Sequence, residues 1–236
     1  PRITQRICGV CPIAHHMAAA KAGDAVYHDD PPATAKKLRE LMYSAFFVAD
    51  HATHFYILGG PDFVVGPDAP KSERNILGVV KKVGKAFGAK VMQLLKDNHE
   101  ITAFIGGRYI HSVSAIVGGV SKPITEDDRL AILERAKRSV EFAQETLELF
   151  EDIVLGNPDY VEMITSDSFA HETYYMGLVD ENNHVNFYDG KVRVVSPQGN
   201  ELVKYAPDEY LDVIAEHLEP WTYLKFPYLK SVGWKG

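Results

Sequence analysis

Residues 6–15 read Arg-Ile-Cys-Gly-Val-Cys-Pro-Ile-Ala-His, and this stretch holds both cysteines of the 236-residue chain. Two cysteines three positions apart, followed by Pro12 and an Ala-rich run, are predicted to place both sulfur atoms on one side of the first turn of a helix. Helix N-terminal amides and the nearby Arg6 would lower the pKa of both thiols. Gly9 would let the backbone pass close to whatever the sulfurs hold.

This cysteine pair is open to three interpretations, since two soft thiolates suit zinc, copper, iron–sulfur or nickel but rarely close a metal site alone. A thioredoxin-like redox pair expects a βαβ context, and no strand pattern precedes Cys8. A structural zinc site could add His15 or His16 to Cys8 and Cys11, yet no second ligand pair follows at the usual spacing. The third interpretation is a larger metal cluster completed by residues from outside this chain.

Composition narrows the class of protein. Hydrophobic residues make up 46% of the chain and charged residues 24%, which is ordinary for a globular protein of one or two domains. The net charge is −7 without a long basic run, so no nucleic acid and no anionic membrane surface is expected as a partner. The apolar stretch around residues 46–58 is interrupted by Asp50, His51 and His54. No membrane span is therefore predicted, because a span needs ~20 apolar residues.

The periodicity of the chain predicts a mainly α fold with a small antiparallel β element, an α+β class. Apolar residues recur at helical spacing up to residue 155, and Thr125 with the acidic residues after it is typical of a helix start. Short apolar runs separated by turn residues over 184–205 indicate two or three strands. We expect a helical core over 1–156 and a smaller part over 157–236. The expected helices cover 12–26, 31–58, 72–105, 125–155 and 207–218, with a break at 59–61, a loop over 61–70, and irregular chain after 221.

Three segments resemble one known family. The run from Arg6 to His15 matches the amino-proximal signature of the nickel–iron hydrogenase large (alpha) subunit, Arg-x-Cys-Gly-x-Cys-x-x-x-His, at every position. Residues 50–58 resemble the helix of form Asp-His-x-x-His-Phe-Tyr-x-Leu in that family. Residues 106–119 resemble the Gly-x-x-x-His-Pro…Gly-Gly loop, although Ser112 stands where proline is usual. The resemblance implies an incomplete helical-bundle core, an internal fragment of a protein that extends in both directions.

The resemblance also implies roles for particular residues. Cys8 would be a terminal nickel ligand and Cys11 a sulfur that bridges nickel to an iron carrying carbonyl and cyanide ligands. His15 would donate a hydrogen bond to the bridging sulfur and tune it. Asp50 would be the acidic group near the open metal position, because heterolytic cleavage of H2 needs a base for the proton. These four residues form the expected catalytic set.

Arg6 and His111 are the further residues expected to contact the cofactor. On a helix rich in aromatic residues, His51 and His54 are more often packed, hydrogen-bonded histidines than ligands, and this interpretation is kept for His54. The second cysteine pair of the family, Asp-Pro-Cys-x-x-Cys-x-x-His, does not occur in the sequence, and the glutamate that binds a magnesium-type ion would also lie outside it. The chain alone is therefore not expected to hold the cluster.

Residues 66–75 and 221–228 resemble the cytoplasmic branch of the family, most closely the F420-non-reducing type, which passes electrons to heterodisulfide reductase. F420-reducing, NAD(P)-linked and sulfhydrogenase types are close alternatives. The resemblance implies an oxidoreductase that cleaves H2 reversibly, and its expected partner is an iron–sulfur small subunit, since this chain has no further cysteines for an electron relay. The alternatives are a non-catalytic relative, such as a scaffold or quinone-site-like subunit, and a structural zinc-binding protein.

Overall fold

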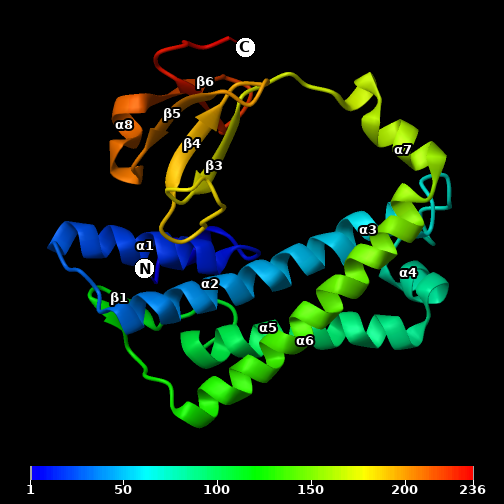
Figure 1. The fold of residues 1–236 in the computed structure, drawn as a ribbon, viewed down its shortest axis with the longest axis horizontal. Coiled ribbons are helices and arrows are strands. Elements are labelled where there is room, and N and C mark those ends of the chain that lie inside the picture. Colours follow the sequence, from blue (N-terminus) through cyan, green and yellow to red (C-terminus); the bar gives the residue numbers. More distant parts are fainter. Residues whose placement is uncertain (1, 236) are drawn as a thin grey trace. The chain divides into compact units, whose positions relative to one another are not determined.

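The structure is a computed structural model that describes residues 2–235 apart from the side chain of Phe169. The chain forms two compact units, Pro1–Ser166 and Asp167–Gly236, the first mainly helical and the second built around small antiparallel sheets (Figure 1). This confirms the α+β class. The subdivision was predicted after residue 156 but lies after Ser166. The reason is helix α7 (Pro158–Thr165), which the Tyr160 hydroxyl ties to the helical unit by donating to the carbonyl of Phe63 at 3.1 Å.

The helical unit begins with a short 3-10 turn, η1 (Thr4–Ile7), and helix α1 (Pro12–Tyr27). Pro12 occupies the first turn of α1, where its missing N–H leaves no intrahelical bond unmade. The helix ends at His28, which adopts a left-handed conformation with φ of 55°. The predicted helix over 12–26 is therefore confirmed.

The second helix runs further than predicted. Helix α2 (Ala33–Thr53) continues through a π-helical turn, η2 (His54–Gly59), into α3 (Gly60–Val64). The expected break at residues 59–61 and the loop from 61 were wrong, because Pro61 lies in the first turn of α3, a position that needs no backbone N–H. The π-helical turn η2, which is wider than an α turn, joins α2 to α3 without a break in the helix.

The predicted helix over 72–105 is two helices, α4 (Ile76–Val83) and α5 (Lys85–Gly106). They separate at Gly84, whose φ of +91° is accessible to glycine but strained for other residues. The Asn75 side chain caps α4 by accepting from the backbone N–H groups of Leu77 and Gly78.

Helix α6 (Glu126–Phe150) starts as predicted and ends in a second π turn, η3 (Glu151–Leu155). Thr125 Oγ1 accepts from the N–H of Asp128 at 3.2 Å, and the Asp128 carboxylate accepts from the N–H of Thr125 at 2.8 Å. Helices α2, α5 and α6 pack side by side (Figure 1). Their shared core contains Ala49, Ala52, Tyr56, Val91, Leu94, Leu95 and Phe142.

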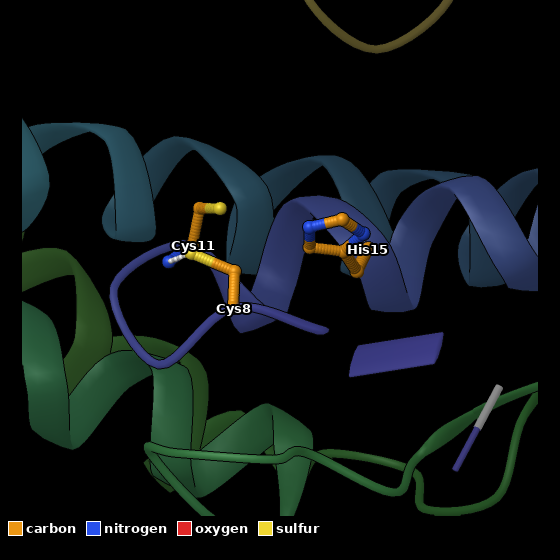
Figure 2. A group of neighbouring side chains, drawn as sticks. All are labelled: Cys8, Cys11 and His15. Atoms are coloured by element: carbon orange, nitrogen blue, oxygen red, sulfur yellow. Dashed lines mark hydrogen bonds between the residues drawn. The ribbon is translucent and has the colours of Figure 1, made fainter. Parts of the chain in front are cut away.

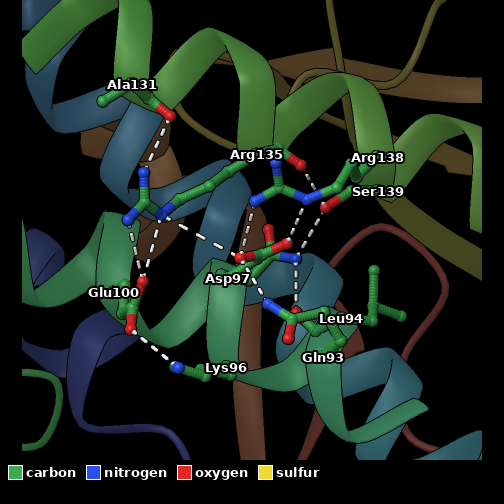
Figure 3. A network of polar contacts seen from close by, with 10 residues as sticks. Gln93, Leu94, Lys96, Asp97, Glu100, Ala131, Arg135, Arg138 and Ser139 are labelled. Atoms are coloured by element: carbon green, nitrogen blue, oxygen red, sulfur yellow. Dashed lines mark hydrogen bonds and ion pairs between the residues drawn. The ribbon is translucent and has the colours of Figure 1, made fainter. Parts of the chain in front are cut away.

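A network of polar contacts joins α5 to α6 (Figure 3). The Asp97 side chain is 3% exposed and accepts from Nε and Nη2 of Arg138, both at 2.9 Å. Arg135 donates to Glu100 at 3.0 and 3.1 Å. A buried carboxylate is stable only when it is paired and hydrogen-bonded, so these arginines fix the register of α6 against α5.

The loop between α5 and α6 contains a hairpin that was not predicted, with strands β1 (Ala115–Ile116) and β2 (Gly119–Val120). Each strand has two residues, which is too short to leave an alternating pattern in the sequence. Gly118 and Gly119 supply the positive φ angles of its turn.

The second unit contains a three-stranded antiparallel sheet of β3 (Tyr175–Val179), β4 (Lys191–Val195) and β5 (Glu201–Tyr205). The predicted two or three strands are confirmed, although β3 precedes the predicted range. The predicted helix over 207–218 was wrong beyond residue 213. A 3-10 turn (Pro207–Glu209) and short helix α8 (Tyr210–Val213) lead into β6 (Ile214–Leu218).

Strand β6 pairs with β7 (Lys225–Leu229), which lies in the stretch expected to be irregular. This pairing buries Ile214 and Leu229 against Val194 and Tyr205 of the first sheet, and burial of these apolar side chains overrides the local helix preference. No helix in the described part of the chain is long and apolar enough to cross a membrane.

Candidate metal centre

Cys8, Cys11 and His15 come together at the amino end of α1 (Figure 2). Their donor atoms all lie within 4.8 Å of one another. Cys8 lies in extended chain directly after η1, and Cys11 is the residue that precedes the first turn of α1. His15 follows one turn later, and its N–H donates to the carbonyl of Cys11 at 3.4 Å. The structure thus brings together three of the residues that the sequence singled out, Cys8, Cys11 and His15.

The two thiols are not equivalent. The Cys11 side chain and the backbone N–H groups of Cys11 and Val10 donate to the Cys8 sulfur and lower the pKa of Cys8. The same hydrogen bond to Cys8, together with burial, raises the pKa of Cys11 to about 11. The expectation that both pKa values are lowered was wrong for Cys11, because one proton shared between two adjacent sulfurs stabilises one thiolate at the expense of the other.

Arg6 does not supply the charge that was expected beside the sulfurs. Its guanidinium is exposed and donates to the backbone carbonyl of Arg2. The lowered pKa of Cys8 comes from Cys11 and Val10 instead.

Asp50 lies half-buried in the last turn of α2, outside the group of donor atoms that Cys8, Cys11 and His15 form. Its negative charge nevertheless opposes the lowering of the Cys8 pKa, adds to the raised pKa of Cys11 after hydrogen bonding and burial, and adds to the effect of burial on Tyr109, whose pKa is raised. This arrangement suits a base near the metal donors rather than a ligand.

His111 lies in the loop after α5 and adopts a left-handed conformation with φ of 57°. It is outside the described group of metal donors. Ser112 is completely buried beside it and donates from Oγ to the carbonyl of Arg108 at 2.6 Å. The Ser112 hydroxyl therefore closes this turn, at the position where the family that this chain resembles has proline.

His16, His51 and His54 lie outside the group of donor atoms. His51 is exposed and donates to the carbonyl of Phe47 at 2.9 Å. His54 is exposed in η2, so its interpretation as a packed histidine was wrong. His16 is 1% exposed, burial lowers its pKa to about 4, and its Nε2 accepts from the N–H of Ala115 at 3.1 Å. The zinc interpretation can therefore use His15 but not His16.

Sequence reasoning missed two aromatic residues near the site. Burial and then the charge of Cys11 raise the pKa of Tyr43 in α2. Tyr109 stacks on His99 of α5, with ring centroids 3.6 Å apart. Tyr43 belongs to no motif and Tyr109 is a variable position of the loop motif, so their position in the fold reveals them.

The donor set fits a soft metal. Two sulfurs and an imidazole within 4.8 Å suit nickel, iron or zinc in preference to the hard cations magnesium and calcium. Three donors do not complete a four-coordinate site, so a metal held here would need ligands from elsewhere.

Comparison with known proteins agrees with this chemistry. Residues 1–87 match the nickel-dependent hydrogenase family. Over its full length the chain is 44% identical to an iron-sulfur subunit of the F420-non-reducing hydrogenase of Archaeoglobus profundus, of which it covers 49%. It is 43% identical over 234 residues to a vhu subunit of the F420-non-reducing hydrogenase of Methanocaldococcus jannaschii, covering 99% of this chain and 54% of that one.

The likeness to hydrogenases extends to three dimensions. The structure superposes on a solved NAD+-reducing [NiFe]-hydrogenase in the H2-reduced state with a TM-score of 0.90 at 32% identity, covering 98% of this chain and 51% of that one. The chain spans about half the length of the curated hydrogenase relatives it matches. The fold is thus similar to that of about half of this hydrogenase chain.

Proposed function

We propose that this chain is part of the large subunit of a nickel–iron hydrogenase, an oxidoreductase that cleaves H2 reversibly into protons and electrons. The observation that carries the proposal is the convergence of Cys8, Cys11 and His15 within 4.8 Å at the start of α1, in the region that matches the nickel-dependent hydrogenase family. When bound, the nickel–iron centre, with carbonyl and cyanide on its iron, supplies the heterolytic cleavage of H2.

The residues of this chain would hold and adjust that centre. Cys8 and Cys11 would provide two of its four thiolates, and the hydrogen bond from the Cys11 N–H already orients the Cys8 sulfur. His15 would donate to a ligand sulfur and limit its basicity. The Asp50 carboxylate would accept a proton at an oxygen atom, since its field reaches both sulfurs while it stays outside the ligand group.

Roles for the remaining parts of the site are proposed from the sequence resemblance. Arg6 and His111 would contact the cofactor or its surroundings once the rest of the protein is in place. Two further thiolates and any magnesium-type ion would be held by residues outside this chain.

The relatives support the F420-non-reducing type, because several of them carry that name. An iron–sulfur small subunit would take the electrons, and heterodisulfide reductase would be the next acceptor. The complex would work in the cytoplasm.

Metal analysis of the complex purified under anaerobic conditions tests this function. The full-length large subunit with its small subunit is expected to contain nickel and iron and to catalyse H2-dependent dye reduction. Cys11→Ser should remove the nickel and abolish activity, whereas His28→Gln, at the exposed end of α1, should change neither. Zinc alone in the wild-type complex would establish the structural zinc alternative, and absence of all three metals would establish a non-catalytic relative.

A further inference from the structure

The hairpin of β1 and β2 lies along one face of α1. The N–H of Ala115 donates to His16 Nε2 at 3.1 Å, and the N–H of Gly118 donates to Asp24 Oδ1 at 2.8 Å. Between these points the turn packs closely, since a Cβ on Gly23 would meet the Val117 side chain at 2.7 Å. His16 and Asp24 are two turns apart on the same face of the helix.

A residue of α2 closes the Asp24 end of this contact. Arg39 is 1% exposed and donates to Asp24 at 2.6 Å, to the carbonyl of Ile116 at 2.6 Å, and to the carbonyl of Gly119 at 2.9 and 3.1 Å. The carboxyl half of α1 is therefore held by several charged hydrogen bonds, which are stronger than neutral ones.

The cysteine end of α1, where Ile13 and Met17 are buried, has fewer polar contacts to the hairpin among the described residues. Cys11 occupies the N-cap position without a side-chain hydrogen bond to the first turn, where Ser, Thr, Asp or Asn would normally accept one. Among the residues that the structure describes, His16 links this half of the helix to the hairpin by a hydrogen bond. Ala115 is itself 1% exposed, so its N–H needs an acceptor from the protein.

The neighbouring His15 and His16 point about 100° apart around the helix axis. His15 reaches the sulfurs while His16 reaches the hairpin. A rotation of the first turns would break the His16 bond and move His15 and Cys11 together, because all three are carried by the same turns of backbone.

We propose that His16 is a positioning residue of the metal centre: by accepting the Ala115 N–H it fixes the rotation of the first turns of α1, and with it the directions of Cys11 and His15. The inference rests on the proposed function. It assigns the hairpin a role as the rigid support against which the donor atoms are aligned.

Matched substitutions separate this role from simple packing. The side-chain oxygen of Gln in His16→Gln can occupy the place of Nε2 and accept the same N–H, whereas Asn in His16→Asn is too short, and Leu in His16→Leu fills the volume without an acceptor. His28→Gln is the control on the same helix. All four variants are made in the full-length hydrogenase complex.

Three readouts are compared with the wild type: hydrogen exchange at the Ala115 amide, nickel retained during dialysis against a chelator, and the nickel electron paramagnetic resonance spectrum. His16→Asn and His16→Leu should speed exchange at Ala115 by about tenfold, weaken nickel retention by roughly 10–100-fold and shift the spectrum. His16→Gln and His28→Gln should retain wild-type values. If the Leu variant does not accumulate, the Asn and Gln pair carries the comparison.

The result that overturns the inference is faster exchange at Ala115 with unchanged nickel retention and an unchanged spectrum, which would make His16 a packing residue only. Loss of nickel in His16→Gln as severe as in His16→Asn would also overturn it, since the acceptor would then be irrelevant. A wild-type complex without nickel would instead contradict the proposed function. The nickel content of the wild type therefore separates a failure of the proposed function from a failure of this inference.

Discussion

The backbone N–H of Cys11 donates to the Sγ atom of Cys8 at 3.2 Å, across the turn that leads into α1. The bond orients the Cys8 sulfur toward its neighbour before any metal is bound. It adds to the side-chain hydrogen bond from Cys11, which is the main reason that the pKa of Cys8 is lowered and that of Cys11 is raised. A metal ion that binds both sulfurs would displace the shared proton, so metal binding here should release protons.

Asp50→Asn should separate catalysis from metal binding. Asp50 lies outside the donor group, so the variant is expected to keep its nickel while H2 oxidation falls by roughly 10²–10⁴-fold, the usual effect of losing a positioned base. Metal analysis and dye-reduction assays on the same preparation measure both. Asp68→Asn, in an exposed loop, is the control. Normal turnover in Asp50→Asn would exclude the carboxylate as the proton acceptor.

Gly106→Ala should destabilise the end of α5. A Cβ at this position would lie 2.4 Å from Ser112 Oγ and 2.8 Å from Met42 Sδ, and the Ser112 hydroxyl is held by the carbonyl of Arg108. The overpacking should lower the free energy of unfolding by about 1–3 kcal/mol, measured by urea denaturation. Gly177→Ala in β3, where nothing lies within 4 Å, should leave it nearly unchanged. Equal stability of the two variants would show that the turn around Ser112 yields easily.

Acid should weaken the contact between Asp24 and Arg39. Burial alone would raise the pKa of Asp24, but hydrogen bonds from Arg39 and the Gly118 N–H outweigh it and lower the pKa. A folded-state pKa below the unfolded one means that the stabilisation is complete above about pH 4 and is lost as pH falls through the folded value. Wild-type stability should therefore fall more steeply than that of Asp24→Asn as the pH drops below about 4.

The comparison uses denaturant unfolding at several pH values. Asp30→Asn is the control, because the Asp30 side chain is 87% exposed in its pair with Lys36, and its acid dependence should equal that of the wild type. An identical acid dependence for wild type and Asp24→Asn would contradict the assignment of this pair.

Asp97→Ala should disrupt the packing of α5 against α6. The change leaves Arg138 without its carboxylate partner and Gln93 without its acceptor. Breaking a buried pair costs up to about 3–5 kcal/mol, and the partial exposure of Arg138 puts the expected loss near the low end, about 3 kcal/mol. Thermal unfolding measures it. Glu134→Ala removes an exposed pair with Lys137 and should cost less than about 1 kcal/mol; a comparable loss in both would argue against a structural role for the buried carboxylate.

The sequence alone determined the features that depend on near neighbours. The start of α6 follows from Thr125 and Asp128, three residues apart, whose reciprocal hydrogen bonds need no other part of the chain. The convergence of Cys8, Cys11 and His15 follows likewise from spacing within two turns. Such contacts form wherever the local backbone forms, so a pattern of residue types predicts them.

The tertiary structure alone decided the features that join distant segments. Ala115 and His16 are 99 residues apart, and Arg39 and Gly119 are 80 apart, so no local pattern records either contact. The same holds for β6, whose residues read as helix until pairing with β7 buries Ile214 and Leu229. Burial of apolar surface and pairing of buried polar groups outweigh local propensity by several-fold. The motif therefore places the donor atoms near one another, and packing of the hairpin and helix α2 against α1 determines the directions in which they point.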